Sequence, residues 1–341
     1  MAPLELPIHG TDATDARALL AAHPPIDLHA DTLMWSRWFG YDVRKRHEPP
    51  LWRAAFAGHI DLPRLREGGM GAQFFSLVSV PFSTGMRGMA RVIDEEIDIL
   101  DAVLVQVPTE LRLVRTAADI ETCREDGAIG ALLGIEGAHA LDGDIDRIEH
   151  FARRGVRYLG LVHFTANEAA HPALGLGRRD GAGLTRWGFD LVRRCETAHV
   201  LVDLAHINRQ GFMDACSVAT KPVIVSHTGV KGAFDLWRNI DDAQLKAVAE
   251  TGGAVGVAFY PWYLGGDGLD PIIKHLRHII NVCGEDTPAL GSDWDGLIIP
   301  TTPLQDPRGL PRLTQALIDA GLGERVISKI LRINIMRVLG S

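Results

Sequence analysis

Pro25-Ile26-Asp27-Leu28-His29-Ala30-Asp31 is the stretch that decides the fold. Its apolar part, Ile26 to Leu28, has the pattern of a short buried strand, and a histidine and an aspartate stand at its end. Successive side chains of a strand point to opposite faces, so His29 and Asp31 are expected to share one face. Such a pair can bind one metal ion, but the triplet is common by chance. The interpretation therefore depends on how the other strands end.

Seven further apolar runs follow along the chain and alternate with longer segments of helical pattern. The predicted strands are Ile26 to Leu28, Gly71 to Val80, Ala128 to Ile135, Val156 to Val162, Val200 to Leu204, Pro222 to Val225, Ala254 to Phe259 and Pro288 to Leu290. Eight strands alternating with helices predict a parallel sheet, most simply closed into a single (β/α)8 TIM-type barrel. A doubly wound open sheet is the alternative, although we find no GxGxxG after the first strand and no Walker A motif.

The remaining segments complete the predicted architecture. A leading helix is expected over Ala16 to Ala22, capped by Thr11 or Asp12, and a closing helix over Gly323 to Leu339. Residues 35–59 are rich in Arg and Trp without clear periodicity, which indicates a long loop after the first strand, serving as a lid or a dimer contact. The helices expected between the strands are Met89 to Val105, Asp144 to Arg154, Thr185 to Ala198, Arg209 to Ala219, Asp241 to Glu250, Asp270 to Val282 and Pro311 to Ala320. We predict one domain over residues 1–341, with 1–24 as an N-terminal extension.

Composition excludes several classes of protein. The chain of 341 residues is 46% hydrophobic with a net charge of −8, and it has no basic block, so no nucleic-acid partner is expected. Its four cysteines are scattered without a CxxC pair, which favours reduced thiols. No apolar run approaches ~20 residues, and the N-terminus lacks the features of a signal peptide. We therefore expect no membrane segment and a cytoplasmic location.

Residues able to bind metal or move protons end six of the eight predicted strands. Besides the His29 and Asp31 pair, they are Glu136, His163, His206, His227 and Asp293. A parallel barrel brings the carboxyl ends of its strands to one rim, so these side chains should become neighbours. Imidazole and carboxylate donors without cysteine suit Zn²⁺ or a similar ion. The number of donors suits two metal ions about 3.5–4 Å apart.

The chain resembles the renal (membrane) dipeptidase family of zinc metallopeptidases, part of the amidohydrolase superfamily, from about Pro25 to Val338. The matching motifs are Asp27-Leu28-His29-Ala30-Asp31, His59-Ile60-Asp61-Leu62-Pro63-Arg64-Leu65, Gly71-Ala72-Gln73-Phe74-Phe75-Ser76, Gly134-Ile135-Glu136-Gly137, Arg157-Tyr158-Leu159 with His163, Asp203-Leu204-Ala205-His206, Val225-Ser226-His227, Arg238-Asn239, Gly291-Ser292-Asp293-Trp294-Asp295-Gly296, and Asn334 with Arg337-Val338. The resemblance implies a binuclear zinc site bridged by a hydroxide and by Glu136, with His29 and Asp31 on the first ion. His206 and His227 would complete the second.

The resemblance also implies roles in catalysis. Asp293 would be the general acid and base, with a pKa depressed by the neighbouring cations. His163 would stabilise the tetrahedral oxyanion and contact substrate, and Arg238 would bind the carboxylate at the substrate's C-terminus. Tyr260 follows the seventh strand and either lines the pocket or packs at its rim.

Three nearby residues are given no direct role in the chemistry. His139 is interpreted as a loop residue or as a neighbour of the ligands, and not as a ligand itself. Asp295 is interpreted as a turn residue or as a carboxylate that supports the ligands, and Ser226 is not expected to be a nucleophile.

The expected function is that of a dipeptidase acting on small dipeptide-like substrates, with tolerance for a D-residue at the C-terminal position. A homodimer is the assembly considered. One alternative keeps the metals but cleaves N-acyl amino acids or other small amides. A second alternative is a metal-binding scaffold without turnover, against which the presence of Asp293 and His163 argues.

Overall fold

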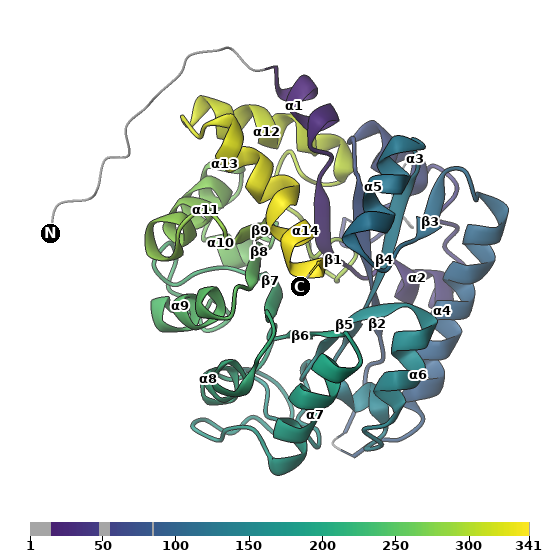
Figure 1. Cartoon of the computed structure of the whole chain (residues 1–341), viewed down its shortest axis with the longest axis vertical. Helices are drawn as coiled ribbons and strands as arrows, with labels where there is room; N and C mark the ends of the chain where they lie inside the picture. Colours follow the sequence, from purple (N-terminus) through teal and green to yellow (C-terminus); the bar gives the residue numbers. More distant parts are fainter. Residues whose placement is uncertain (1–14, 48–54, 84, 341) are drawn as a thin grey trace, which may run out of the picture.

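The predicted barrel is confirmed in the computed structural model, which describes residues 15–47, 55–83 and 85–340 (Figure 1). Eight parallel strands form the ring: β1 (Ile26–Ala30), β2 (Ala72–Val78), β4 (Ile129–Glu136), β5 (Val156–Gly160), β6 (Leu201–Asp203), β7 (Ile224–Thr228), β8 (Ala254–Val257) and β9 (Pro288–Leu290). Pairing of β2 with both β1 and β4 closes the ring, which rules out the open doubly wound sheet.

A ninth strand among the described residues lies outside this ring and was not predicted. β3 (Leu111–Leu113) pairs with the first residues of β4, where Leu111 faces Ile129. β5 pairs with the later part of the same strand, from Leu133 to Ile135. Three residues are too few to show a strand period, so the sequence pattern gives no signal for β3.

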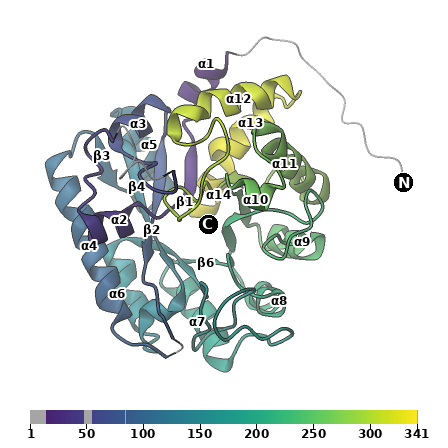
Figure 2. The ribbon, with the colours of Figure 1, turned by 180° about the vertical axis from the view of Figure 1, so that it is seen from behind.

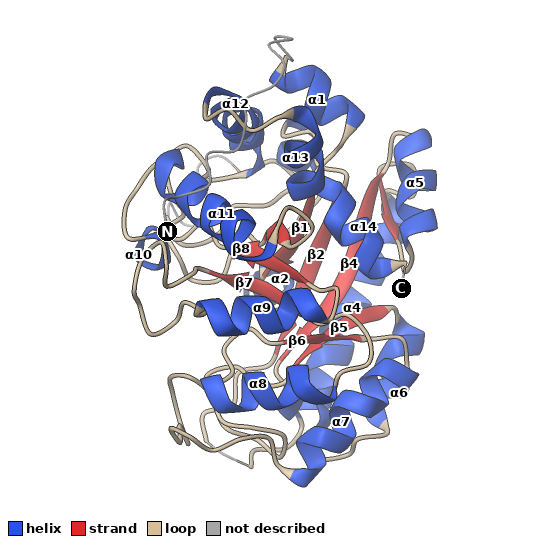
Figure 3. Cartoon of the chain, turned by 60° about the vertical axis from the view of Figure 1, so that its left-hand side comes forward, coloured by secondary structure: helices blue, strands red, loops and turns tan. Residues whose placement is uncertain are grey.

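Helices surround the barrel, as Figure 3 shows. The longer ones are α4 (Met89–Gln106), α5 (Ala117–Glu125), α6 (Arg147–Arg154), α7 (Arg186–Thr197), α8 (Arg209–Val218), α9 (Asp242–Glu250), α11 (Leu269–Cys283) and α12 (Leu310–Asp319). Prediction missed α5 and the short α2 (Thr32–Phe39), α3 (Leu62–Glu67) and α10 (Pro261–Leu264). None of the described helices is long and apolar enough to cross a membrane.

Both terminal helices are present. α1 (Ala16–Ala22) buries Leu19 and Leu20 beside α12 (Figures 1 and 2). Its N-cap is Asp15, whereas the predicted caps Thr11 and Asp12 lie outside the described residues. The closing segment is helical throughout, as α13 (Glu324–Ser328), a π-helical turn (Lys329–Ile333) and α14 (Asn334–Leu339).

The closing helix belongs to the barrel core. Ile335 and Val338 of α14 pack in one apolar cluster with Ile26, Leu132 and Ile224 of the strands. Burial of these side chains fills the interior at this end of the barrel, and the predicted site is expected at the other end, where the strands terminate.

The segment after β1 is only partly the loop that was expected, because its first residues form α2. Asp295, which follows β9, holds this segment on the barrel. Its carboxylate accepts hydrogen bonds from the Thr32 hydroxyl and the His59 amide, both at 2.7 Å. Its carbonyl accepts from the Trp35 indole, also at 2.7 Å. Residues 48–54 lie outside the described residues.

Replacing Asp295 by alanine should lower the free energy of unfolding by about 3 kcal/mol, because two buried donors lose their acceptor. Urea denaturation measures this, with Asp319→Ala as the control. Among the described residues, the Asp319 side chain accepts one exposed hydrogen bond, from Gln315, so its loss should cost under about 0.5 kcal/mol. Equal stability of the two variants would contradict the role given to Asp295.

Candidate metal centre

The five expected ligands lie together at the carboxyl ends of the strands. Glu136 is the last residue of β4, His29 and His227 lie within β1 and β7, and Asp31 and His206 follow β1 and β6. All five are buried, with exposed fractions between 0% and 6%. Residues separated by up to 198 positions therefore form one cluster, as the barrel topology requires.

Their ligand atoms form two groups that share Glu136. In the first group, His29 Nε2 lies 3.3 Å from Asp31 Oδ1 and 3.6 Å from Glu136 Oε1. In the second, the Nε2 atoms of His206 and His227 lie 3.1 and 3.6 Å from the same Glu136 oxygen. Two adjacent sets of three donors with one carboxylate in common can hold a pair of metal ions.

The backbone arrangement that places Asp31 in this cluster differs from the one predicted. β1 ends at Ala30, and its register against β2 shifts between Asp27 and Ala30. Asp31 stands at the N-cap of α2 but makes no side-chain capping bond there. Simple strand alternation therefore does not explain the pair, because the irregular strand end and the turn into α2 place the carboxylate beside His29.

Several buried polar atoms of the cluster fit a cation. His29 Nε2 and Asp31 Oδ1 have no hydrogen-bond partner among the described residues. The Nε2 atoms of His206 and His227 are 2.8 Å apart. Two unprotonated ring nitrogens at this distance repel each other unless a proton or a metal ion lies against them, and unpaired buried polar atoms are costly. The residues present therefore fit a metal centre.

Electrostatics supports this fit. Burial and nearby positive charges, Arg238 among them, hold the pKa of His206 and His227 well below the ordinary value, so both rings are neutral at pH 7. Burial opposes a charge on His29 as well, but the Asp31 and Glu136 carboxylates outweigh it and raise the pKa of His29 to about 10. The His29 side of the cluster thus attracts positive charge.

Supporting carboxylates lie beneath the cluster, and prediction did not single them out. Asp203 accepts hydrogen bonds from the Ser226 amide and hydroxyl, both at 2.7 Å, and the Ser226 hydroxyl lies 3.0 Å from His227 Nδ1. Asp27 accepts from the Ser292 amide and hydroxyl, also at 2.7 Å. The sequence signal for both residues was an aspartate inside an otherwise apolar predicted strand. Ser226 is thus a link between Asp203 and His227.

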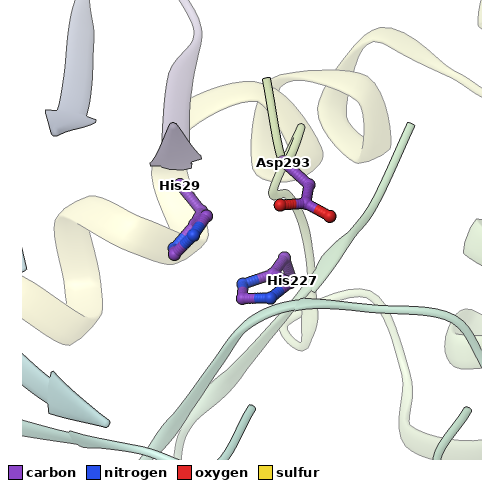
Figure 4. Close-up of side chains that lie close together, drawn as sticks. All are labelled: His29, His227 and Asp293. Atoms are coloured by element: carbon purple, nitrogen blue, oxygen red, sulfur yellow. The ribbon is translucent and has the colours of Figure 1, made fainter. Parts of the chain in front are cut away.

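Asp293 faces the same cluster from the end of β9. Figure 4 shows its carboxylate beside His29 and His227, and the three ligand atoms lie within 4.8 Å of one another. Its backbone is left-handed (φ 63°), as is that of His206 (φ 65°), a conformation that non-glycine residues adopt at a cost. Among the protein groups alone, burial raises the pKa of Asp293 to about 7, while His29 and Arg238 lower it. The depressed pKa that was expected would require the added charge of the cations.

His163, after β5, borders the cluster on the other side. Its Nε2 lies 3.6 Å from Glu136 Oε2, and its ring stands edge-on to His206 at 4.7 Å. Burial lowers the pKa of His163 to about 3, so the ring is neutral at pH 7. A neutral imidazole can still donate one N–H bond to a substrate oxygen.

Arg238 is buried close to the cluster, with an exposed fraction of 4%. Its guanidinium donates to the His227 carbonyl at 2.9 Å and to the Thr228 hydroxyl at 3.3 Å, and it lies over the ring of Tyr263. Its Nε has no partner among the described residues. A buried cation with an unused donor is suited to bind an anionic group.

Tyr260 is placed differently from Tyr263. It is half-buried at the N-cap of α10, and its ring contacts Trp262 and Tyr263. Tyr263, which was not singled out from the sequence and which lies 25 positions after Arg238, is the tyrosine whose ring lies against the guanidinium. The aromatic run Phe259-Tyr260-Pro261-Trp262-Tyr263 was the signal, but periodicity could not choose among its members. His139 is in none of the groups of candidate ligands among the described residues.

Comparison with known proteins places the chain in a family. The sequence model of the membrane dipeptidase family (peptidase family M19) matches residues 13–341. An uncharacterized Klebsiella pneumoniae protein from the pqqA 5′ region is 36% identical over 255 residues, which cover 72% of this chain and 94% of that protein. The dipeptidase tcpJ of Claviceps purpurea is 29% identical over 325 residues, covering 92% and 76%.

A solved structure extends the comparison. The metallopeptidase from Rhodobacter sphaeroides, liganded with a phosphinate mimic of the dipeptide L-Ala-D-Ala, has a TM-score of 0.83 and 27% identity, covering 93% of this chain and 98% of that one. The chain therefore belongs to the membrane dipeptidase family, peptidase family M19, and is a metal-dependent hydrolase of the dipeptidase type.

Proposed function

We propose that the protein hydrolyses the amide bond of free dipeptides with two zinc ions, and that it accepts a D-residue at the C-terminal position. The observation that carries the proposal is Glu136, whose Oε1 lies within 3.6 Å of three imidazole Nε2 atoms and belongs to both groups of ligand atoms. His29 and Asp31 would hold one ion, and His206 and His227 the other.

The residues around the two groups of ligand atoms would each carry out a different step of the reaction. Bound zinc would polarise the scissile carbonyl and lower the pKa of a water molecule to near neutrality. Asp293, beside His29 and His227, would accept the proton of the attacking water and deliver it to the leaving amine nitrogen. His163 would donate its N–H to the carbonyl oxygen as that oxygen becomes negative.

Arg238 would set which peptide bond lies at the ligand cluster. Its guanidinium is anchored to the His227 carbonyl, so it is held next to the residue that would bind the second ion. A dipeptide can place its carboxylate on Arg238 and its only peptide bond at the ligand cluster, whereas a longer peptide places its last peptide bond there. Recognition of the free carboxylate would therefore direct cleavage to the peptide bond beside the C-terminal residue, which in a dipeptide is the only one.

Acceptance of a D-residue is supported by the Rhodobacter sphaeroides metallopeptidase, which binds a mimic of L-Ala-D-Ala. A panel of L,L and L,D dipeptides, with N-acyl amino acids beside them, tests the proposal when combined with elemental analysis of the bound metal. We expect two zinc ions per chain and turnover of both dipeptide series. Turnover of the N-acyl compounds alone would replace the dipeptidase assignment.

Replacing Arg238 by lysine should lower kcat/KM for dipeptides roughly 100-fold, because the flat, bidentate guanidinium is lost from a buried position. The matched substrate is the same dipeptide with a C-terminal amide. Wild-type protein should discriminate strongly against the amide, and the variant should turn over both compounds at similar low rates. A variant that keeps full discrimination would show that another residue binds the carboxylate.

A further inference from the structure

Tyr158 of β5 makes a contact with the metal centre that the mechanism above does not use. The residue is fully buried, and its ring packs against Phe74 at 5.1 Å. Its hydroxyl oxygen lies 2.9 Å from Nδ1 of His29. The phenol of β5 therefore touches a residue of β1 from inside the barrel.

The neighbouring strand β4 leaves room for the Tyr158 ring. Gly134 of β4 pairs in register with Tyr158. A Cβ atom at Gly134 would lie 2.0 Å from Tyr158 Cζ and within 2.3 Å of two other ring carbons. Only glycine leaves room for the ring, so Gly134 permits Tyr158 to reach His29.

The orientation of His29 gives this contact a consequence. Its Nε2 faces Asp31 and Glu136, at 3.3 and 3.6 Å, and has no hydrogen-bond partner among the described residues. To bind a cation, Nε2 must offer its lone pair, so the single proton of the neutral ring must be on Nδ1. Nδ1–H would then donate to the Tyr158 oxygen.

We propose that Tyr158 is a positioning residue of the metal centre, whose hydroxyl oxygen holds His29 in the Nδ1–H tautomer and directs Nε2 at the ion. The proposal rests on the proposed function, because it requires His29 to be a metal ligand. Such partners of ligating histidines are usually carboxylates, carbonyls or water. Here the partner of His29 is the neutral phenol of Tyr158. The carboxylates near this phenol are those of Asp27, Asp31, Asp203 and Glu136.

The effect should be confined to one half of the centre. His227 is supported differently, through the Ser226 hydroxyl, which lies 3.0 Å from its Nδ1 and donates to Asp203 at 2.7 Å. Loss of the Tyr158 hydroxyl leaves that chain of contacts intact. The ion held by His29 and Asp31 should therefore weaken more than the ion held by His206 and His227.

The test compares Tyr158→Phe with Tyr41→Phe, both of which delete one buried hydroxyl and keep the ring. Tyr41 donates to the Ile60 carbonyl at 2.8 Å, away from the ligand cluster. Competition with a chelator should show that Tyr158→Phe weakens binding of one of two Zn²⁺ ions about 10- to 100-fold. Tyr41→Phe should change neither affinity more than twofold. The visible absorption of the Co²⁺-substituted protein should change in Tyr158→Phe alone.

Two further variants make the outcome unambiguous. Gly134→Ala, which displaces the ring, should weaken the same ion. His29→Gln should weaken it further, and unchanged affinity in that variant would contradict the ligand assignment in the proposed function. Loss in His29→Gln without any loss in Tyr158→Phe, or an unaltered Co²⁺ spectrum in Tyr158→Phe, would overturn the role of Tyr158 alone.

Discussion

Replacing Asp293 by asparagine is expected to lower kcat for dipeptide hydrolysis by roughly 10²–10⁴-fold while the protein keeps two metal ions per chain. Asparagine has almost the same shape but cannot take up and release a proton in this step. The five residues assigned to the ions do not include Asp293, so metal content should not change. Steady-state kinetics and elemental analysis of the same sample measure both quantities.

Measuring kcat and metal content together separates two roles for the Asp293 carboxylate, proton transfer and metal binding. Asp293 also forms a possible ligand group with His29 and His227. If it binds an ion, Asp293→Asn should lose metal and activity together. Asp319→Asn, which alters an exposed carboxylate, is the control and should change neither. Activity above a tenth of the wild-type value would contradict the proton-transfer role.

Much of the candidate site could be predicted, because a parallel barrel converts a simple sequence pattern into spatial proximity. Glu136 and His227 each end an apolar run, and the topology places both at one rim, where His227 Nε2 lies 3.6 Å from Glu136 Oε1. That inference needed only the position of each residue at the end of a predicted strand. The same reasoning placed His29, His206 and Asp293 at one rim.

Prediction was weaker where position depends on backbone irregularity or on packing. Asp31 reaches the cluster through a shifted register and a turn, and His206 through a left-handed residue, neither of which an alternating pattern specifies. Tyr263, which lies against Arg238, belongs to the short helix α10, which the sequence pattern did not indicate. The Tyr158 contact with His29 depends on the absence of a side chain at Gly134, a pairing visible only in the register of β4 and β5.

Glu136→Gln is expected to have the largest effect on metal binding, because Glu136 is the one residue common to both groups of ligand atoms. Glutamine keeps the volume but removes the negative charge that faces three imidazoles. We expect fewer than one Zn²⁺ per chain after dialysis and a loss of dipeptidase activity of at least about 10³-fold, since the chemistry depends on the ions. Elemental analysis and kinetics provide the measurement.

Glu96→Gln supplies a matched control for this experiment. Glu96 of α4 is equally buried, and its carboxyl accepts a hydrogen bond from the Val78 amide at 2.7 Å. Burial raises the pKa of Glu96 well above its usual range, which favours the neutral acid that glutamine resembles in charge. Burial also raises the pKa of Glu136, but Glu136 has imidazoles against its oxygens, and a bound cation would keep it ionised. The two variants change buried glutamates but have opposite expected outcomes, so together they test whether the Glu136 carboxylate is shared by both ions. Retention of two ions by Glu136→Gln would exclude Glu136 as the bridge.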